Sequence, residues 1–108
     1  MAFAEVWKEL QSRLTVGAII ANWTANRGLI GDPFIIVEVT ETHIVVDTPG
    51  AKRLQPVPIA DFEAIYDCWS DYCHRAKLRS DFKPLTRYSK YVISILHCLE
   101  SELGGHLP

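Results

Sequence analysis

Apolar residues recur at steps of three and four positions in three segments of the chain, which is the spacing of one face of an α-helix. In the first segment, charged and polar side chains occupy the opposite face, as in a helix that packs on a core. The pattern predicts a helix over about residues 2–14, with Gly17 at its end or just beyond it. The apolar positions of this helix are Phe3, Val6, Trp7, Leu10 and Leu14.

The second segment predicts a helix over about residues 59–74, with an apolar stripe that includes Phe62 and Ile65. Its two ends agree with the helix dipole, which favours negative charge at the start and positive charge at the end. Acidic residues lie in the first turn, whereas His74 and Arg75 close the segment.

The third segment predicts a helix over about residues 86–103. Thr86, which follows Pro84, is the expected N-cap, and the pair Gly104-Gly105 is expected to end the helix. The apolar face holds two tyrosines near the start and valine, isoleucine and leucine after them, whereas basic and polar side chains occupy the other face.

Between the first two helices the periodicity changes to two, and β-branched residues dominate. Two such runs, separated by three polar residues, predict an antiparallel hairpin over about residues 34–48. Ile35, Val37 and Val39 alternate along its first strand, and we expect the face that they share to be the buried one.

Residues 16–23 predict a further strand, and residues 53–57 predict a short edge strand limited by prolines. Strands that are grouped rather than alternating with helices favour an α+β fold with an antiparallel sheet. We therefore expect a single domain over residues 1–108, in which a small sheet of three or four strands packs with three amphipathic helices. The 108 residues, 48% hydrophobic and 22% charged, are typical of a globular domain and exclude a disordered or fibrous chain.

No apolar run approaches the roughly 20 residues that a membrane span requires, so we expect no membrane contact. The N-terminus carries acids where a secretory signal would carry basic residues. Three cysteines, an odd number without a C-x-x-C pair, argue against a disulfide framework. These features favour a cytoplasmic location, and the pattern makes no prediction about a homo-oligomer.

Charge is distributed unevenly along the chain. Six of the eleven Lys and Arg residues fall between His74 and Tyr91, together with one acid, Asp81. This basic stretch has a net charge of +5, while the whole chain has −2 and the remainder therefore −7. Such a local field is what an anionic partner would meet. The six cations are Arg75, Lys77, Arg79, Lys83, Arg87 and Lys90.

We expect the basic stretch to be the contact surface of a non-catalytic binding module, with nucleic acid or an acidic protein as its partner. Arg87, Lys90 and Ser94 share one face of the last predicted helix and can project together, near the free N–H groups of its start. Tyr88 and Tyr91 can stack on unpaired nucleobases or, more simply, pack in the core.

The alternative interpretation of the basic stretch is a solvated loop whose cations balance the second helix, where Asp67 and Asp71 are close in sequence. The negative net charge of the whole chain and the absence of a known DNA- or RNA-binding motif favour this alternative.

A second candidate site is the turn-rich segment that follows residues 16–23, where a tryptophan is flanked by amides. Asn22, Trp23 and Arg27 are a candidate ligand-binding rim, because loops on a rigid scaffold often carry function. The alternative is a Trp that closes one end of the sheet while Asn and Gly shape the loop.

Patterns typical of catalysis or metal binding are weak. The pairs Cys73-His74 and His97-Cys98 offer sulfur and nitrogen ligands, but neighbours on a helix point about 100° apart. No zinc-binding spacing is present, and Cys73 at a helix C-terminus is poorly placed for a thiolate. We predict no catalytic residue, no metal and no cofactor, with a small enzyme built from dispersed Asp, His and Cys side chains as the competing class.

Overall fold

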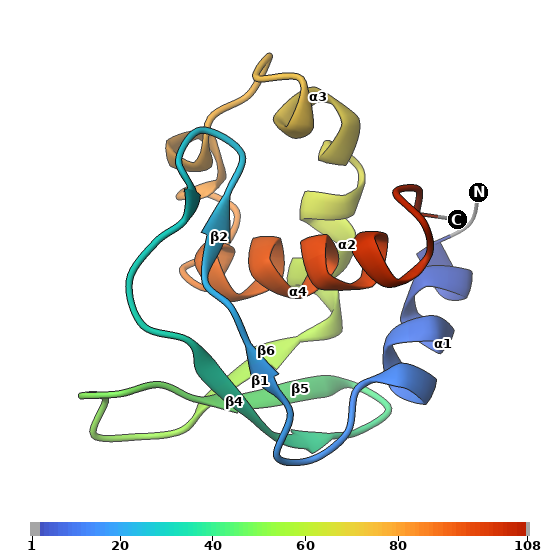
Figure 1. Ribbon diagram of the computed structural model, residues 1–108. Helices are drawn as coiled ribbons and strands as arrows, with labels where there is room; N and C mark the ends of the chain where they lie inside the picture. The colour runs from blue at the N-terminus through green and yellow to red at the C-terminus, as the bar shows by residue number, and fades with distance from the viewer. Residues whose placement is uncertain (1–2, 108) are drawn as a thin grey trace.

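The structure is a computed structural model that describes residues 3–107 (Figure 1). Its strands are grouped after the first helix and pair in antiparallel fashion, so the predicted α+β fold is confirmed. The elements in chain order are α1 (Phe3–Arg13), β1 (Ile19–Ile20), β2 (Trp23–Thr24), β3 (Gly28–Leu29), β4 (Phe34–Val39), β5 (His43–Asp47), β6 (Gln55–Pro58), α2 (Ile59–Tyr66), α3 (Trp69–Cys73), a 3-10 turn (Arg79–Phe82) and α4 (Ser89–Glu102).

The main sheet has the strand order β1-β4-β5-β6. β4 and β5 form the predicted hairpin, and β6 is the predicted edge strand, a position in which proline is tolerated. The strand predicted over residues 16–23 is divided in the structure. β1 pairs with β4, whereas β2 leaves the main sheet and forms a separate two-stranded hairpin with β3.

The buried face of β4 differs from the prediction. Phe34 and Ile36 are buried, whereas Ile35 is exposed, since successive side chains of a strand point to opposite faces. The register against β5 then shifts between Ile36 and Glu38. This bulge adds one residue and reverses the alternation, so Val39 packs against the core as predicted although Ile35 does not.

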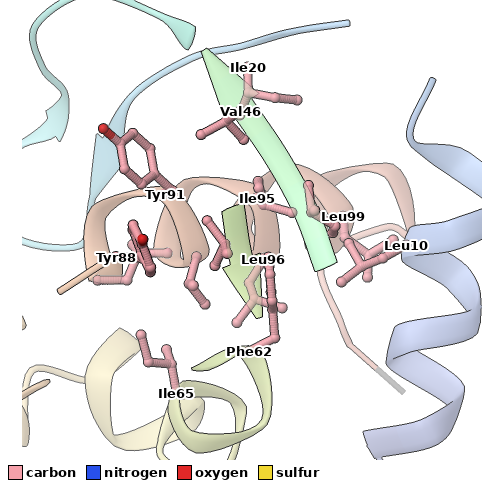
Figure 2. Close-up of a cluster of buried hydrophobic side chains, with 14 of the residues drawn as sticks. Leu10, Ile20, Val46, Phe62, Ile65, Tyr88, Tyr91, Ile95, Leu96 and Leu99 are labelled. Atoms are coloured by element: carbon pink, nitrogen blue, oxygen red, sulfur yellow. The ribbon is translucent and has the colours of Figure 1, made fainter. Parts of the chain in front are cut away.

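α4 lies across the centre of the molecule, between the main sheet and α2, with the β2–β3 hairpin along its first half (Figure 1). Side chains from the sheet and from two other helices meet along it. Figure 2 shows Ile20 and Val46 from the sheet, Phe62 and Ile65 from α2, and Leu10 from α1 around Tyr88, Tyr91, Ile95, Leu96 and Leu99. No helix described between residues 3 and 107 is long and apolar enough to cross a membrane.

Two helix predictions need correction, and one agrees. α1 matches the prediction of 2–14 to within a residue at its end, while residue 2 lies outside the described residues. The helix predicted over 59–74 is interrupted at Asp67 and Cys68, which separates α2 from α3. Cys68 has φ −112° and ψ 13°, outside the helical region, although the apolar stripe continues through it.

α4 begins at Ser89 rather than at Thr86, and Tyr88 occupies its N-cap position. The hydroxyl of Thr86 accepts the Tyr88 N–H at 2.9 Å, and it donates to the Asp61 carboxylate in α2. Thr86 therefore orders the turn before the helix and joins it to α2, because a threonine side chain can satisfy backbone donors outside a helix.

Candidate functional site

The connector between α3 and α4 begins with an unusual backbone. Arg75 has φ 63°, in the left-handed region that glycine normally occupies at the end of a helix. The Ala76 N–H donates to the Asp71 carbonyl at 2.8 Å, and the Arg75 N–H donates to the Tyr72 carbonyl at 3.1 Å. This pattern is a Schellman motif, with arginine in the place of the usual glycine.

The rest of the connector is held against the body of the protein. Phe82 is buried and lies 5.6 Å from Tyr72, measured between ring centroids. Asp81, the one acid of the basic stretch, accepts the Leu78 N–H at 2.8 Å. The connector is therefore an ordered scaffold, from which Arg79 and Lys83 extend into solvent.

A pocket of about 380 Å³, which we call the loop pocket, lies between this connector and the loop of the β2–β3 hairpin. The hydroxyl of Tyr72 accepts the Ala25 N–H at 3.0 Å and so ties the hairpin loop to α3. Four cations line the loop pocket together with apolar side chains. The cations are Arg27, Arg75, Lys77 and Arg79.

The three residues of the candidate rim have different positions. Arg27 lines the loop pocket. Trp23 stacks on His97 of α4, with 3.7 Å between ring centroids and 2° between ring planes. The side-chain oxygen of Asn22 lies 3.4 Å from the Ser94 hydroxyl. Asn22 and Trp23 thus hold the hairpin on α4, and Arg27 is the member of the set that reaches the loop pocket.

Two further hollows are also lined by cations. One, of about 360 Å³ at the start of α4, is lined by four of the predicted cations: Arg79, Lys83, Arg87 and Lys90. The other, of about 670 Å³ beside β6, shares Arg87 and Lys90 with it and adds Arg53. Each hollow shares at least one lining cation with the next, so the three are neighbours on the surface. We call the eight cations that line them the cationic track.

Sequence reasoning found seven of these eight cations but missed Arg53. Arg27 was assigned to a separate rim, and Arg53 lies more than 20 positions before the basic stretch. Pairing of β6 with β5 brings Arg53 toward the start of α4. The clustering of Arg53 with the basic stretch is therefore a product of the tertiary fold, and no local pattern signals it.

The face of α4 that was expected to project Arg87, Lys90 and Ser94 together is not a single exposed face. Arg87 precedes the helix, and Ser94 is 1% exposed because the β2–β3 hairpin covers it. Its hydroxyl accepts the Trp23 N–H at 3.0 Å. Ser94 is therefore an anchor for the hairpin and takes no part in the cationic track.

The two tyrosines at the start of α4 belong mainly to the core, since Tyr88 and Tyr91 are 8% and 7% exposed. The Arg87 guanidinium lies 5.0 Å from the ring centroid of Tyr88 and donates to its hydroxyl at 2.9 Å. The Lys90 ammonium lies 5.0 Å from the ring centroid of Tyr91. Cation–π contacts of this kind orient the two cations without neutralising them.

Carboxylates do not neutralise the cationic track. No acid lines any of its three hollows. Among the described residues, ion pairs within 4.0 Å are formed by Arg13 alone, with Glu9 and Glu102. The proposed balance with Asp67 and Asp71 therefore involves no direct ion pair. The track carries +8, and the remaining three basic and 13 acidic residues carry −10.

The cysteine and histidine pairs were considered as metal ligands and as a source of a thiol nucleophile. Burial, together with the smaller effect of the negative charge of Glu100, raises the pKa of Cys73 to about 11. Burial likewise raises the pKa of Cys98. Neither thiol is therefore activated as a nucleophile at neutral pH. His74, on an exposed turn, places its Nδ1 2.8 Å from the Ser70 carbonyl.

No group of three or more His, Cys, Asp or Glu side chains within residues 3–107 is arranged to hold a metal ion. The cationic track is thus the feature of the described chain with the clearest chemical preference, which is for anions. Compared with protein-family models, curated proteins and solved structures, this chain matches none of them.

Proposed function

We propose that the protein is a non-catalytic nucleic-acid-binding module whose cationic track holds the phosphates of a strand. The observation that carries this proposal is a set of three neighbouring hollows that are lined by eight cations and no carboxylate. Lys and Arg side chains that converge on one surface are the groups that neutralise successive phosphates. Arg79, Lys83, Arg87 and Lys90 are the central contacts, because each of them lines the middle hollow at the start of α4.

The start of α4 adds to this preference for phosphate. The N-terminal N–H groups of a helix carry partial positive charge, and Ser89 and Lys90, the first two residues of α4, line the middle hollow. A phosphate held there would meet backbone donors as well as side-chain cations.

The test is fluorescence anisotropy of labelled single-stranded and double-stranded DNA and RNA, titrated with the protein at about 50 and about 200 mM salt. Binding should weaken steeply as salt rises, since phosphate contacts release counterions. The double variant Arg79→Glu/Lys83→Glu should weaken binding at least about tenfold and reduce the slope of log K against log salt by about two. Among the described residues, neither side chain forms a hydrogen bond or an ion pair, and both are exposed, so the variant should remain folded.

Lys8→Glu/Lys52→Glu is the matched control, because it makes the same change in net charge at two exposed lysines that line none of the three hollows and form no ion pair among the described residues. It should leave the salt slope unchanged. Equal losses in the two double variants would show that binding follows net charge alone and would contradict the proposal. Absence of binding at low salt would also reject nucleic acid as the partner, and an acidic protein would then be sought by pull-down.

A further inference from the structure

The loop pocket differs in chemistry from the other two hollows of the cationic track. Beside its four cations it has an apolar lining of Ala25, Ile30, Leu78 and the ring of Tyr72. Leu78 is 54% exposed, so its side chain lies outside the hydrophobic core. A pocket that combines apolar side chains with cations suits a ligand that has both an apolar ring and an anionic group.

The loop pocket is also lined by a residue that carries a hydrogen-bond donor. Tyr72 is 3% exposed, and its hydroxyl oxygen accepts the Ala25 N–H. Its own proton has no acceptor among the described residues. Burial raises the pKa of this hydroxyl, so it keeps the proton at neutral pH. A ligand in the loop pocket can therefore accept a hydrogen bond from Tyr72.

Arg75 reaches the loop pocket from a strained position. A left-handed conformation costs an L-residue about 1 kcal/mol or more, and glycine would avoid the cost. Strained residues of this kind are concentrated at functional sites. The φ of 63° at Arg75, in a residue that lines the loop pocket, therefore points to a function for its guanidinium there.

We propose that the loop pocket receives one unpaired nucleotide, with its nucleobase against the apolar side chains and its phosphate among the four cations. Its volume of about 380 Å³ lies within the range of roughly 300–1,000 Å³ that is typical of small-molecule sites. Arginine planes and apolar side chains are common partners of splayed nucleobases. This inference rests on the proposed function and makes it more specific: the preferred strand has an unpaired base.

Isothermal titration calorimetry with adenosine monophosphate, ribose 5-phosphate and inorganic phosphate tests the role of the base. Adenosine monophosphate should bind at least about fivefold more tightly than ribose 5-phosphate, which corresponds to the lower limit of a stacked-base contribution. Equal affinities, or no binding of adenosine monophosphate, would overturn the inference.

Leu78→Ser tests the apolar lining without disturbing the core, because Leu78 is exposed. The variant should remove most of the advantage of adenosine monophosphate over ribose 5-phosphate. Leu85→Ser is its matched control, since Leu85 is 55% exposed on the same connector and lines none of the three hollows. If Leu78→Ser and Leu85→Ser bind adenosine monophosphate alike, the loop pocket is not the nucleotide site.

The two proposals fail in different ways. If duplex binding depends steeply on salt and is weakened by Arg79→Glu/Lys83→Glu, the proposal for the cationic track is supported, whatever the result with mononucleotides. A single strand whose affinity falls in Leu78→Ser, while the duplex affinity does not, would support the loop pocket specifically.

Discussion

Arg75 has a side chain suited to anions on a backbone suited to glycine. Its guanidinium lines the loop pocket, and its φ of 63° ends α3. These two properties can be separated by substitution, because the charge and the strain depend on different atoms. If the arginine served stability, its replacement by glycine would lower the free energy of unfolding of the protein. If it serves binding, the replacement would not lower it.

Arg75→Gly should raise the free energy of unfolding by up to about 1 kcal/mol, since glycine adopts the left-handed conformation without a steric cost. It should also weaken binding of adenosine monophosphate, because one cation is lost from the loop pocket. Arg75→Ala is the control: it removes the cation but keeps the strain, so binding should weaken without a gain in stability. Urea unfolding and calorimetry measure the two effects. Equal stability of the two variants would contradict the strain argument.

His97 is a second residue whose environment should have a measurable effect on the free energy of unfolding. Its ring stacks on Trp23, and its Nδ1 is buried without a hydrogen-bond partner among the described residues. Burial lowers the pKa of His97, and the nearby charge of Glu100 opposes this effect only in part. The folded state therefore favours the neutral imidazole, and it binds a proton less readily than the unfolded chain does.

The free energy of unfolding should consequently decrease as pH falls below the unfolded pKa of about 6.5, until the folded pKa is passed. His97→Phe keeps an aromatic ring on Trp23 but cannot titrate, so it should show a weaker pH dependence than the wild type between about pH 7 and about pH 5. Urea unfolding followed by circular dichroism provides the comparison. Parallel pH profiles for the two proteins would exclude His97 as the cause.

At the scale of elements, the β2–β3 hairpin is the part of the fold that completes the loop pocket. Each of its strands has two residues, and its backbone is tied to α4 and α3 through side chains. Ser94 accepts the Trp23 N–H, and Tyr72 accepts the Ala25 N–H. The hairpin therefore depends on hydrogen bonds to residues that the sheet does not supply.

Ser94→Ala should lower the free energy of unfolding by about 1–2 kcal/mol, because the part-buried Trp23 N–H loses its acceptor. Ser101→Ala provides a matched control on the same helix, at an exposed position, and should change stability by less than about 0.5 kcal/mol. Urea unfolding compares the two variants. A Ser94→Ala variant as stable as Ser101→Ala would show that the hairpin does not depend on this hydrogen bond.

Much of the element structure could be predicted from the sequence, because local periodicity carries it. The three-and-four spacing identified α1 and α4, and the alternation of β-branched residues identified the β4–β5 hairpin. Periodicity could not reveal the interruption at Cys68, since the apolar stripe remains in phase across it. It also placed Ile35 on the buried face, because a bulge shifts the alternation without changing composition.

The candidate site was only partly predictable for a different reason. The basic stretch is local, and its six cations were visible as a run in the sequence. Arg27 and Arg53 join them through contacts made by distant strands. Ser94 looked like part of the polar face of a helix, because its partner Trp23 lies 71 residues away. Such pairings depend on the tertiary fold, so a pattern of neighbouring residues does not contain them.

At the scale of the whole molecule, the chain is a negatively charged protein with one strongly positive surface. The cationic track carries +8 and the remainder −10. A charged ligand therefore meets attraction on one side and repulsion elsewhere, which orients the encounter before contact.

The rate constant of association with an oligonucleotide should fall as salt rises from about 50 to about 200 mM, since salt screens this field. The Arg79→Glu/Lys83→Glu variant should associate more slowly than Lys8→Glu/Lys52→Glu, although the two have the same net charge. Stopped-flow anisotropy measures both rate constants. Identical rate constants for the two variants would show that the position of the charge has no influence on the encounter.

The tethering of the β2–β3 hairpin by two side chains has a consequence for local opening. Its contacts join residues 47 and 71 positions apart, and the core of sheet, α2 and α4 is formed without it. The buried hydrophobic side chains of the core come from other elements, so we expect the hairpin to separate from α4 while that core remains folded. Its amides would then exchange with solvent by local opening, and core amides by global unfolding. A nucleotide held in the loop pocket would slow the exchange of the Ala25 and Ile30 amides. The exchange rates of the most slowly exchanging core amides would be unchanged.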